Sequence, residues 1–92
     1  MSGIERIAAE RKRQMSVKGW TPEHDDGHNN FELLEAAICY ANEYYHAHLD
    51  SVPSSWPWEP EAWKPSTDII RNLEKAGALI AAEIDRLDRT NG

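Results

Sequence analysis

Cysteine is almost absent from this chain, since Cys39 is the only one among 92 residues. A single cysteine cannot form an intrachain disulfide, which is typical of proteins in a reducing compartment. Apolar runs are also short, far below the roughly 20 residues that span a bilayer, and the N-terminal residues show no signal-peptide pattern. We therefore expect a cytoplasmic protein that has no membrane partner.

Basic residues are missing from the middle of the chain. Residues 21–63 contain nine Asp and Glu but no Lys or Arg, residues 1–20 carry a net charge of +3, and residues 64–92 are balanced. A block of carboxylates without basic neighbours needs water, a metal ion or basic residues from elsewhere in the fold. The distribution argues against duplex nucleic acid as a partner, because its phosphate backbone is recognised by clustered positive charge.

No strand-like alternation, internal repeat or low-complexity tract is present, and helical periodicity predicts an all-α fold. We expect one three-helix domain over residues 1–92, with helices over 2–19, from Asn29 or Asn30 to about 45, and from 66–68 to about 88. Ser2 and Glu5 have capping-box spacing, and Gly19 is the expected stop of the first helix. Because a domain of this size buries only a modest core, we also expect a homo-oligomer.

The second helix is predicted to be central, because apolar residues from Phe31 onward cover most of its circumference. One narrow polar stripe interrupts this apolar surface and is expected to face away from the core. It consists of Glu32, Glu35, Cys39, Asn42, Glu43 and His46.

The last helix carries an apolar seam with alternating spacings of three and four, formed by Ile69, Leu73, Ala76, Ile80, Ile84 and Leu87. Such a seam is typical of a core-facing helix side. Small residues cluster within the same helix at Ala76, Gly77, Ala78, Ala81 and Ala82. This cluster predicts either the crossing point on the second helix or a self-association face.

Acidic and histidine side chains gather before and at the start of the second helix, in a segment that Pro22 and Gly27 predict to be irregular. Glu32, Glu35 and Asp25 have the oxygen ligands that Mg²⁺ prefers. A softer, zinc-like metal would instead use His24, Asp26, His28 and Cys39. The third interpretation needs no metal: the acids favour the positive end of a helix dipole, and the histidines cap or pack.

The connection between the second and third helices, residues 47–66, holds four of the five prolines and three of the four tryptophans. The prolines exclude a long helix, although residues 61–63 allow one short turn. Trp56, Trp58 and Trp63 either cover the helices as core or stack against a ligand. In a nucleotide site, Trp or Tyr faces would hold the base, and Arg6, Arg11, Arg13, Lys64 or Arg71 the phosphates. The candidate ligand-binding residues are Trp20, His24, Asp26, His28, Trp56, Trp58, Trp63, Arg13, Lys64 and Arg71.

Three stretches carry a family resemblance: GWTPEHDD at Gly19–Asp26, WPW at Trp56–Trp58 with the following Lys64–Pro65, and KAGALIAAEIDRLDR at Lys75–Arg89. Together they resemble a group of small phage and prophage proteins. The resemblance implies a phage or prophage gene whose product acts in the bacterial cytoplasm.

A second resemblance is to the all-α nucleotide pyrophosphohydrolases of the MazG type. That family binds Mg²⁺ through an ExxE motif on one helix and an ExxD motif on the next, and Glu32–Glu35 supplies an ExxE here. The last helix departs from the pattern because its acids Glu74, Glu83, Asp85 and Asp88 form no ExxD.

Three functions are compatible with these features. The favoured one is a binding module that captures a phosphorylated, nucleotide-like ligand, which would suit sequestration of a host immune signal as phage counter-defence. The second is a Mg²⁺-dependent, MazG-like nucleoside triphosphate pyrophosphohydrolase, with metal-activated water as the nucleophile. In the third, the aromatic loop or the last helix binds a host protein.

Overall fold

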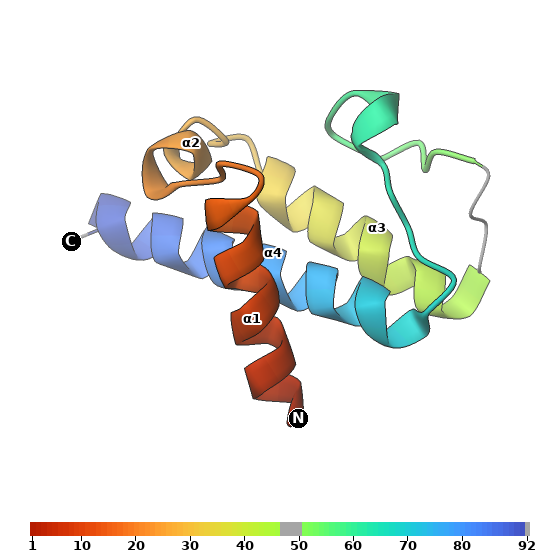
Figure 1. The fold of residues 1–92 in the computed structure, drawn as a ribbon. Coiled ribbons are helices and arrows are strands. Elements are labelled where there is room, and N and C mark those ends of the chain that lie inside the picture. The colour runs from red at the N-terminus through yellow and green to blue at the C-terminus, as the bar shows by residue number, and fades with distance from the viewer. Residues whose placement is uncertain (47–50, 92) are drawn as a thin grey trace.

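The computed structural model describes residues 1–46 and 51–91, and within this part the all-α class is confirmed. The helices are α1 (Gly3–Ser16), α2 (Pro22–Asp26), α3 (Glu32–His46) and α4 (Ile69–Asn91), and a 3₁₀ turn, η1 (Pro60–Ala62), lies in the loop before α4. Figure 1 shows α3 and α4 side by side and antiparallel, with α1 crossing in front of α4. No helix in the described part of the chain is long and apolar enough to cross a bilayer.

The capping signals place the helix ends. Ser2 and Glu5 form the expected capping box, with the Glu5 N–H donating to Ser2 Oγ over 3.1 Å and the Ser2 N–H donating to Glu5 Oε1 over 2.8 Å. Gly19 has a φ of 72°, so it turns the chain out of α1 in the left-handed region that favours glycine. Asp68 caps α4 by accepting from the Ile70 N–H over 3.0 Å.

Helix α2 was not expected, because Pro22 and Gly27 predicted an irregular segment. Pro22 instead occupies the first turn of α2, where a missing N–H costs nothing, and Gly27 is its C-cap. The Thr21 side chain caps the helix by accepting from the His24 N–H over 3.3 Å. The segment is therefore a single ordered turn rather than a loop.

The predicted start of α3 at Asn29 or Asn30 is also wrong, because the helix begins at Glu32. The preceding Phe31 has a φ of 67°, a left-handed conformation that ends the incoming loop and leaves its ring 66% exposed. Phe31 is thus outside the core that it was expected to join.

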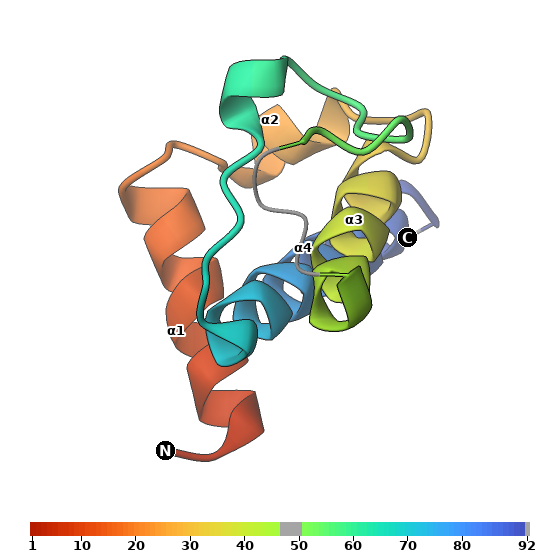
Figure 2. The ribbon, with the colours of Figure 1, turned by 90° about the vertical axis from the view of Figure 1, so that its right-hand side faces the viewer.

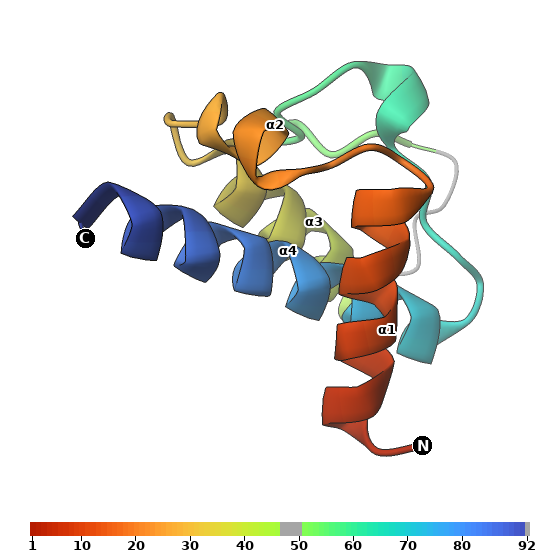
Figure 3. The same cartoon turned by 60° about the vertical axis from the view of Figure 1, so that its left-hand side comes forward.

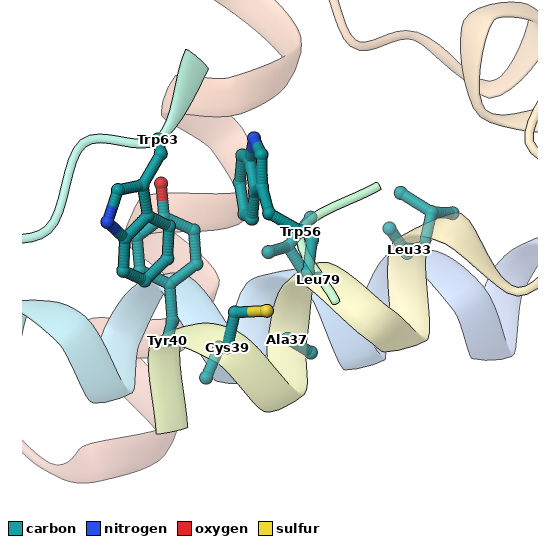
Figure 4. Close-up of a cluster of buried hydrophobic side chains, with 10 residues drawn as sticks. Leu33, Ala37, Cys39, Tyr40, Trp56, Trp63 and Leu79 are labelled. Carbon is teal, nitrogen blue, oxygen red and sulfur yellow. The ribbon is translucent and has the colours of Figure 1, made fainter. Parts of the chain in front are cut away.

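The core lies between α3, α4 and the loop, as Figure 4 shows for Tyr40, Trp56 and Trp63 stacked above α3. Tyr40 meets Trp56 edge-on at 5.6 Å between ring centroids, and Trp63 lies 4.8 Å from the Tyr40 ring. The interpretation of Trp56 and Trp63 as a cover over the helices agrees with this packing.

The polar stripe of α3 faces solvent only in part: Asn42 is exposed, and Glu32 and Glu35 are half-buried. Cys39 is 1% exposed and belongs to the core, with its Sγ 3.4 Å from Ser55 Oγ in the covering loop. The side chains of Glu43 and His46 lie outside the described residues. The prediction is therefore wrong at Cys39, because the loop returns over this part of α3.

The apolar seam of α4 is mostly outside the core, in contrast to the prediction. Only Ala76 is buried, while the seam's other members are between 42% and 57% exposed. The small-residue cluster lies at two helix contacts: Ala76 and Ala82 pack in the core with α3, as predicted, and a Cβ on Gly77 would lie 2.6 Å from Ile7 Cδ1 of α1. Figure 3 shows this crossing of α1 over α4.

Candidate functional site

Four aromatic rings close into a ring-shaped cluster above the core, which we call the aromatic box: Trp20, His24, His28 and Trp58. Successive ring centroids are 6.0 Å apart for Trp20 and His24, 4.8 Å for His24 and His28, 5.1 Å for His28 and Trp58, and 5.7 Å for Trp58 and Trp20. The Trp20 and His24 rings are parallel, with an interplanar angle of 1°. The sequence places these residues in two separate stretches, and the fold brings the two together.

The short helix α2 orients the histidine side of the box. His24 lies in α2 and His28 follows its C-cap, so the spacing of four residues puts both rings on one side. The neighbouring Asp25 is fully buried and accepts from Arg11 Nη2 of α1 over 2.8 Å. This ion pair anchors α2 to α1 and therefore fixes the box.

The box borders an open cavity of about 170 Å³, lined by its four rings and Ala62. Two buried polar atoms of the lining side chains, Trp58 Nε1 and His28 Nε2, have no hydrogen-bond partner among the described residues. An unpartnered buried polar group costs about 1–3 kcal/mol, so native proteins rarely keep one without a reason. Both atoms are themselves shielded from solvent, so the rings that line the cavity, rather than these nitrogens, form the surface that a ligand would meet.

Basic side chains form a second surface beside the box, which we call the cationic patch: Arg13, Lys18, Lys64, Arg71 and Lys75. Its centre is the buried carboxylate of Glu10, which pairs with Arg13 Nε at 2.8 Å and with Arg71 Nη1 at 2.7 Å. Although burial opposes ionisation of Glu10, the hydrogen bonds from these two guanidinium groups hold its pKa below the ordinary value.

The lysines of the patch are less well neutralised than its arginines. Among the described residues, neither Lys18 nor Lys75 has a carboxylate within ion-pair distance; Lys75 Nζ donates to the Lys64 carbonyl. Burial lowers the pKa of Lys75 to about 8, and the neighbouring Arg71 and Lys18 act in the same direction. Burial and the nearby Arg13 and Lys64 also lower the pKa of Lys18. An anion bound here would relieve this repulsion.

Trp20 connects the two surfaces. It lines the cavity of the aromatic box and also a small cavity of about 10 Å³ within the patch, next to Lys18 and Lys75. Lys18 Nζ lies over the Trp20 ring, 5.4 Å from its centroid. The buried Gln14 Oε1 in the same small cavity has no partner among the described residues.

Comparison with known proteins adds nothing to this geometry. The chain matches no family model, no curated protein and no solved structure. The functional argument therefore rests on the chemistry of the aromatic box and the cationic patch.

Seven of the ten candidate ligand-binding residues lie in these two surfaces, and three do not. Trp56 and Trp63 are 9% and 7% exposed, and their indole N–H groups donate to the carbonyls of Glu59 and Ser51. Asp26 lies on the outer side of α2 and binds Arg89 Nη2 over 2.8 Å. Packing and pairing thus account for these three side chains without a ligand.

The three candidate metal ligands do not converge. Asp25 is occupied by Arg11, and Glu32 Oε1 accepts from the Asn30 N–H over 2.6 Å. Within residues 1–46 and 51–91, no group of three His, Cys, Asp or Glu side chains has the arrangement to hold a metal ion. The acidic block is instead partly neutralised by arginines from α1 and α4.

The sequence analysis missed the centre of the patch. Glu10 and Gln14 are 3% and 2% exposed, although both are polar residues on a helix whose Ile4 is 83% exposed. The basic side of the first helix and the acid three residues before Arg13 were the only available signals. The pairing of Glu10 with Arg71 joins residues far apart in the chain, so local spacing does not reveal it.

Proposed function

We propose that this protein binds a nucleotide-like ligand, with the base in the aromatic box and a phosphate on the cationic patch. The observation that carries the proposal is the position of Trp20, which lines both the 170 Å³ cavity and the small basic cavity beside it. Stacking on aromatic side chains and ion pairing with clustered cations are the two means by which proteins hold single nucleotides.

The size of the box supports a planar ring rather than a larger ligand. A cavity of about 150 Å³ is known to bind benzene, and drug-sized ligands occupy about 300–1,000 Å³. The cavity of about 170 Å³ therefore suits one base, while the sugar and phosphate would extend past Trp20. The faces of Trp20 and Trp58 would then stack against the base.

The charge of the patch supports an anionic group. Arg13 and Arg71 both pair with the Glu10 carboxylate, and Arg71 also pairs with Glu74. Lys18, Lys64 and Lys75 remain for the ligand, because none of them forms an ion pair among the described residues. A phosphate is compact enough to contact two lysines together.

The resemblance to phage and prophage proteins suggests the setting of this binding. In a bacterial cytoplasm, capture of a nucleotide without chemical change would withdraw a host immune signal from its receptor. This sequestration role is the biological part of our proposal.

The test is a capture assay with a panel of nucleoside phosphates and cyclic nucleotides in the presence of Mg²⁺. The protein is removed by filtration, and the filtrate is analysed by chromatography before and after the retained fraction is heated. We expect one nucleotide class to disappear and to return intact on heating. The Trp58→Ala variant should release it, whereas Phe31→Ala, which removes an exposed ring outside the box, should retain it.

Two other outcomes would replace the proposal. If monophosphate and pyrophosphate appear, and are lost in the double variant Glu32→Gln and Glu35→Gln, the protein is a pyrophosphohydrolase of the MazG type. If every nucleotide passes through the filter unchanged, nucleotide binding is wrong and a host protein becomes the next candidate partner.

Nucleotide affinity should fall as the pH rises through about 8, because Lys75 has its pKa near that value and loses its charge above it. The other charged or titratable groups near Lys75 are Glu10, Arg13, Lys18, Tyr40 and Arg71. If Lys75 must be charged, affinity should drop about tenfold between pH 7 and pH 9. Titration calorimetry with the captured nucleotide measures this drop, which should shrink in Lys75→Gln but persist in Lys12→Gln. An equal drop in both variants would exclude Lys75 as the cause.

A further inference from the structure

Most isoleucine side chains of this protein are exposed to solvent, which is unusual for a domain that functions as a single chain. Six of its seven isoleucines are at least 45% exposed, and only Ile7 is half-buried. Isoleucine is normally among the most buried residue types. Such a distribution is expected when another surface covers these side chains.

The exposed residues form one continuous face along α3 and α4. On α4 they are Ile69, Leu73, Ile80, Ile84 and Leu87, and on α3 they are Leu34 and Ile38, 40% and 48% exposed. The spacings along each helix put these side chains on one side, and α3 and α4 lie next to each other. Figure 2 shows α2 and the loop on one side of this helix pair, with the opposite side uncovered by any described element.

We infer that a second copy of this chain covers this α3–α4 face, in a two-fold symmetric dimer. The seam of α4 repeats at alternating intervals of three and four, which is the pattern by which helices pack against each other through side-chain interdigitation. In a two-fold dimer the same surface patch of each subunit forms the interface, so one self-complementary seam is sufficient to build it.

The area of the face fits this occupant. At about 1.5 Å rise per residue and about 10 Å helix width, the 23 residues of α4 and the 15 of α3 present roughly 550 Å². A groove of about 270 Å³ between α1 and α4, lined in part by Ile7 and Ile70, shares Leu73 with this face. Two such faces would together bury roughly 1,100 Å², which exceeds the total of about 1,000 Å² that a specific interface needs.

The charges around the face favour a protein surface over a lipid surface. Helices that lie on membranes carry Lys and Arg beside their apolar side, which attract anionic lipids. The exposed charges beside Ile84 and Leu87 are the carboxylates of Asp85 and Asp88, and the chain carries a net charge of −6. Repulsion from an anionic bilayer would therefore oppose membrane docking.

The test is the mass of the full chain in solution, measured by light scattering after size-exclusion chromatography across a wide range of concentrations. We expect a particle of two chains, each of 10.5 kDa. Ile84→Lys should give single chains, because it places a charge within the buried face at the most exposed member of the α4 seam. Val17→Lys should stay dimeric, since Val17 is 72% exposed and lies outside the face.

A single chain at every concentration would overturn the inference and leave the face to a different partner. A dimer that Ile84→Lys does not dissociate would overturn it as well, because the interface would then lie elsewhere. If the lysine variant does not fold, Ile84→Ser replaces it. Its dimer dissociation constant should rise at least tenfold relative to Val17→Ser, and an unchanged constant would contradict the proposed interface.

Discussion

Replacement of Trp63 by alanine is expected to lower the free energy of unfolding by about 3–5 kcal/mol, as is usual for truncation of a buried tryptophan. The indole is 7% exposed, its ring centroid lies 5.0 Å from that of Trp56, and its N–H donates to the Ser51 carbonyl over 3.1 Å. The variant loses ring contacts and leaves that carbonyl without its donor. Urea denaturation measures the effect, which is large against the roughly 5–15 kcal/mol of a typical domain.

Trp58→Ala is the matched comparison, because Trp58 comes from the same loop but is only half-buried and its N–H has no partner among the described residues. It should lower the free energy of unfolding by less than Trp63→Ala does. It should weaken the affinity for the captured nucleotide more than Trp63→Ala does, by about tenfold, since stacking on one base contributes about 1–3 kcal/mol. Both variants are compared under conditions in which the same fraction of each is folded. If Trp63→Ala then weakens nucleotide binding more than Trp58→Ala does, the aromatic box is not the ligand site.

Local sequence signals were sufficient for the secondary structure of most of the chain. The Ser2 and Glu5 pair and Asp68 act within a few residues of the helix starts that they cap, so their spacing predicts those starts. The end of α1 is less well predicted, because the helix ends at Ser16 rather than at Gly19. The short turn expected near residues 61–63 is present as η1. Helix α2 was missed because Pro22 at a first helical turn and Gly27 at a C-cap look the same in sequence as breakers within a loop.

Helical periodicity did not predict which apolar surface is buried. The α4 seam has the spacing of a core-facing helix side, yet Ala76 alone of its six members is buried. Periodicity identifies an apolar face but does not reveal whether the same chain or another copy covers it. The proposed dimer reconciles the pattern with the exposure.

The candidate site was predictable in its residue types and not in its geometry. Aromatic residues beside a Gly-Trp-Thr-Pro segment and a Trp-Pro-Trp loop indicate a stacking site, but only the fold shows that Trp20 and Trp58 meet while Trp56 and Trp63 turn inward. The Glu10–Arg71 ion pair spans most of the chain, so the position of the cationic patch depends on tertiary contacts.

Asp25→Asn should lower the free energy of unfolding by about 3–5 kcal/mol, the usual cost when one partner of a buried ion pair is removed. The Asp25 side chain is fully buried, and the partner Arg11 is 12% exposed, so neither water nor salt screens the remaining charge well. The variant should also weaken nucleotide capture, because this pair holds α2 and with it both histidines of the aromatic box. Urea denaturation and the capture assay measure the two effects.

Asp26→Asn is the matched control on the same helix, since Asp26 also pairs with an arginine but its side chain is 46% exposed. Exposed ion pairs contribute little to stability, so this variant should unfold close to the wild type and keep its ligand. The double variant Arg11→Met with Asp25→Leu should regain part of the stability lost in Asp25→Asn, because no unpaired charge remains buried. Equal losses in Asp25→Asn and Asp26→Asn would show that the buried pair does not anchor α2, and the box would then owe its geometry to the stacking of its own rings.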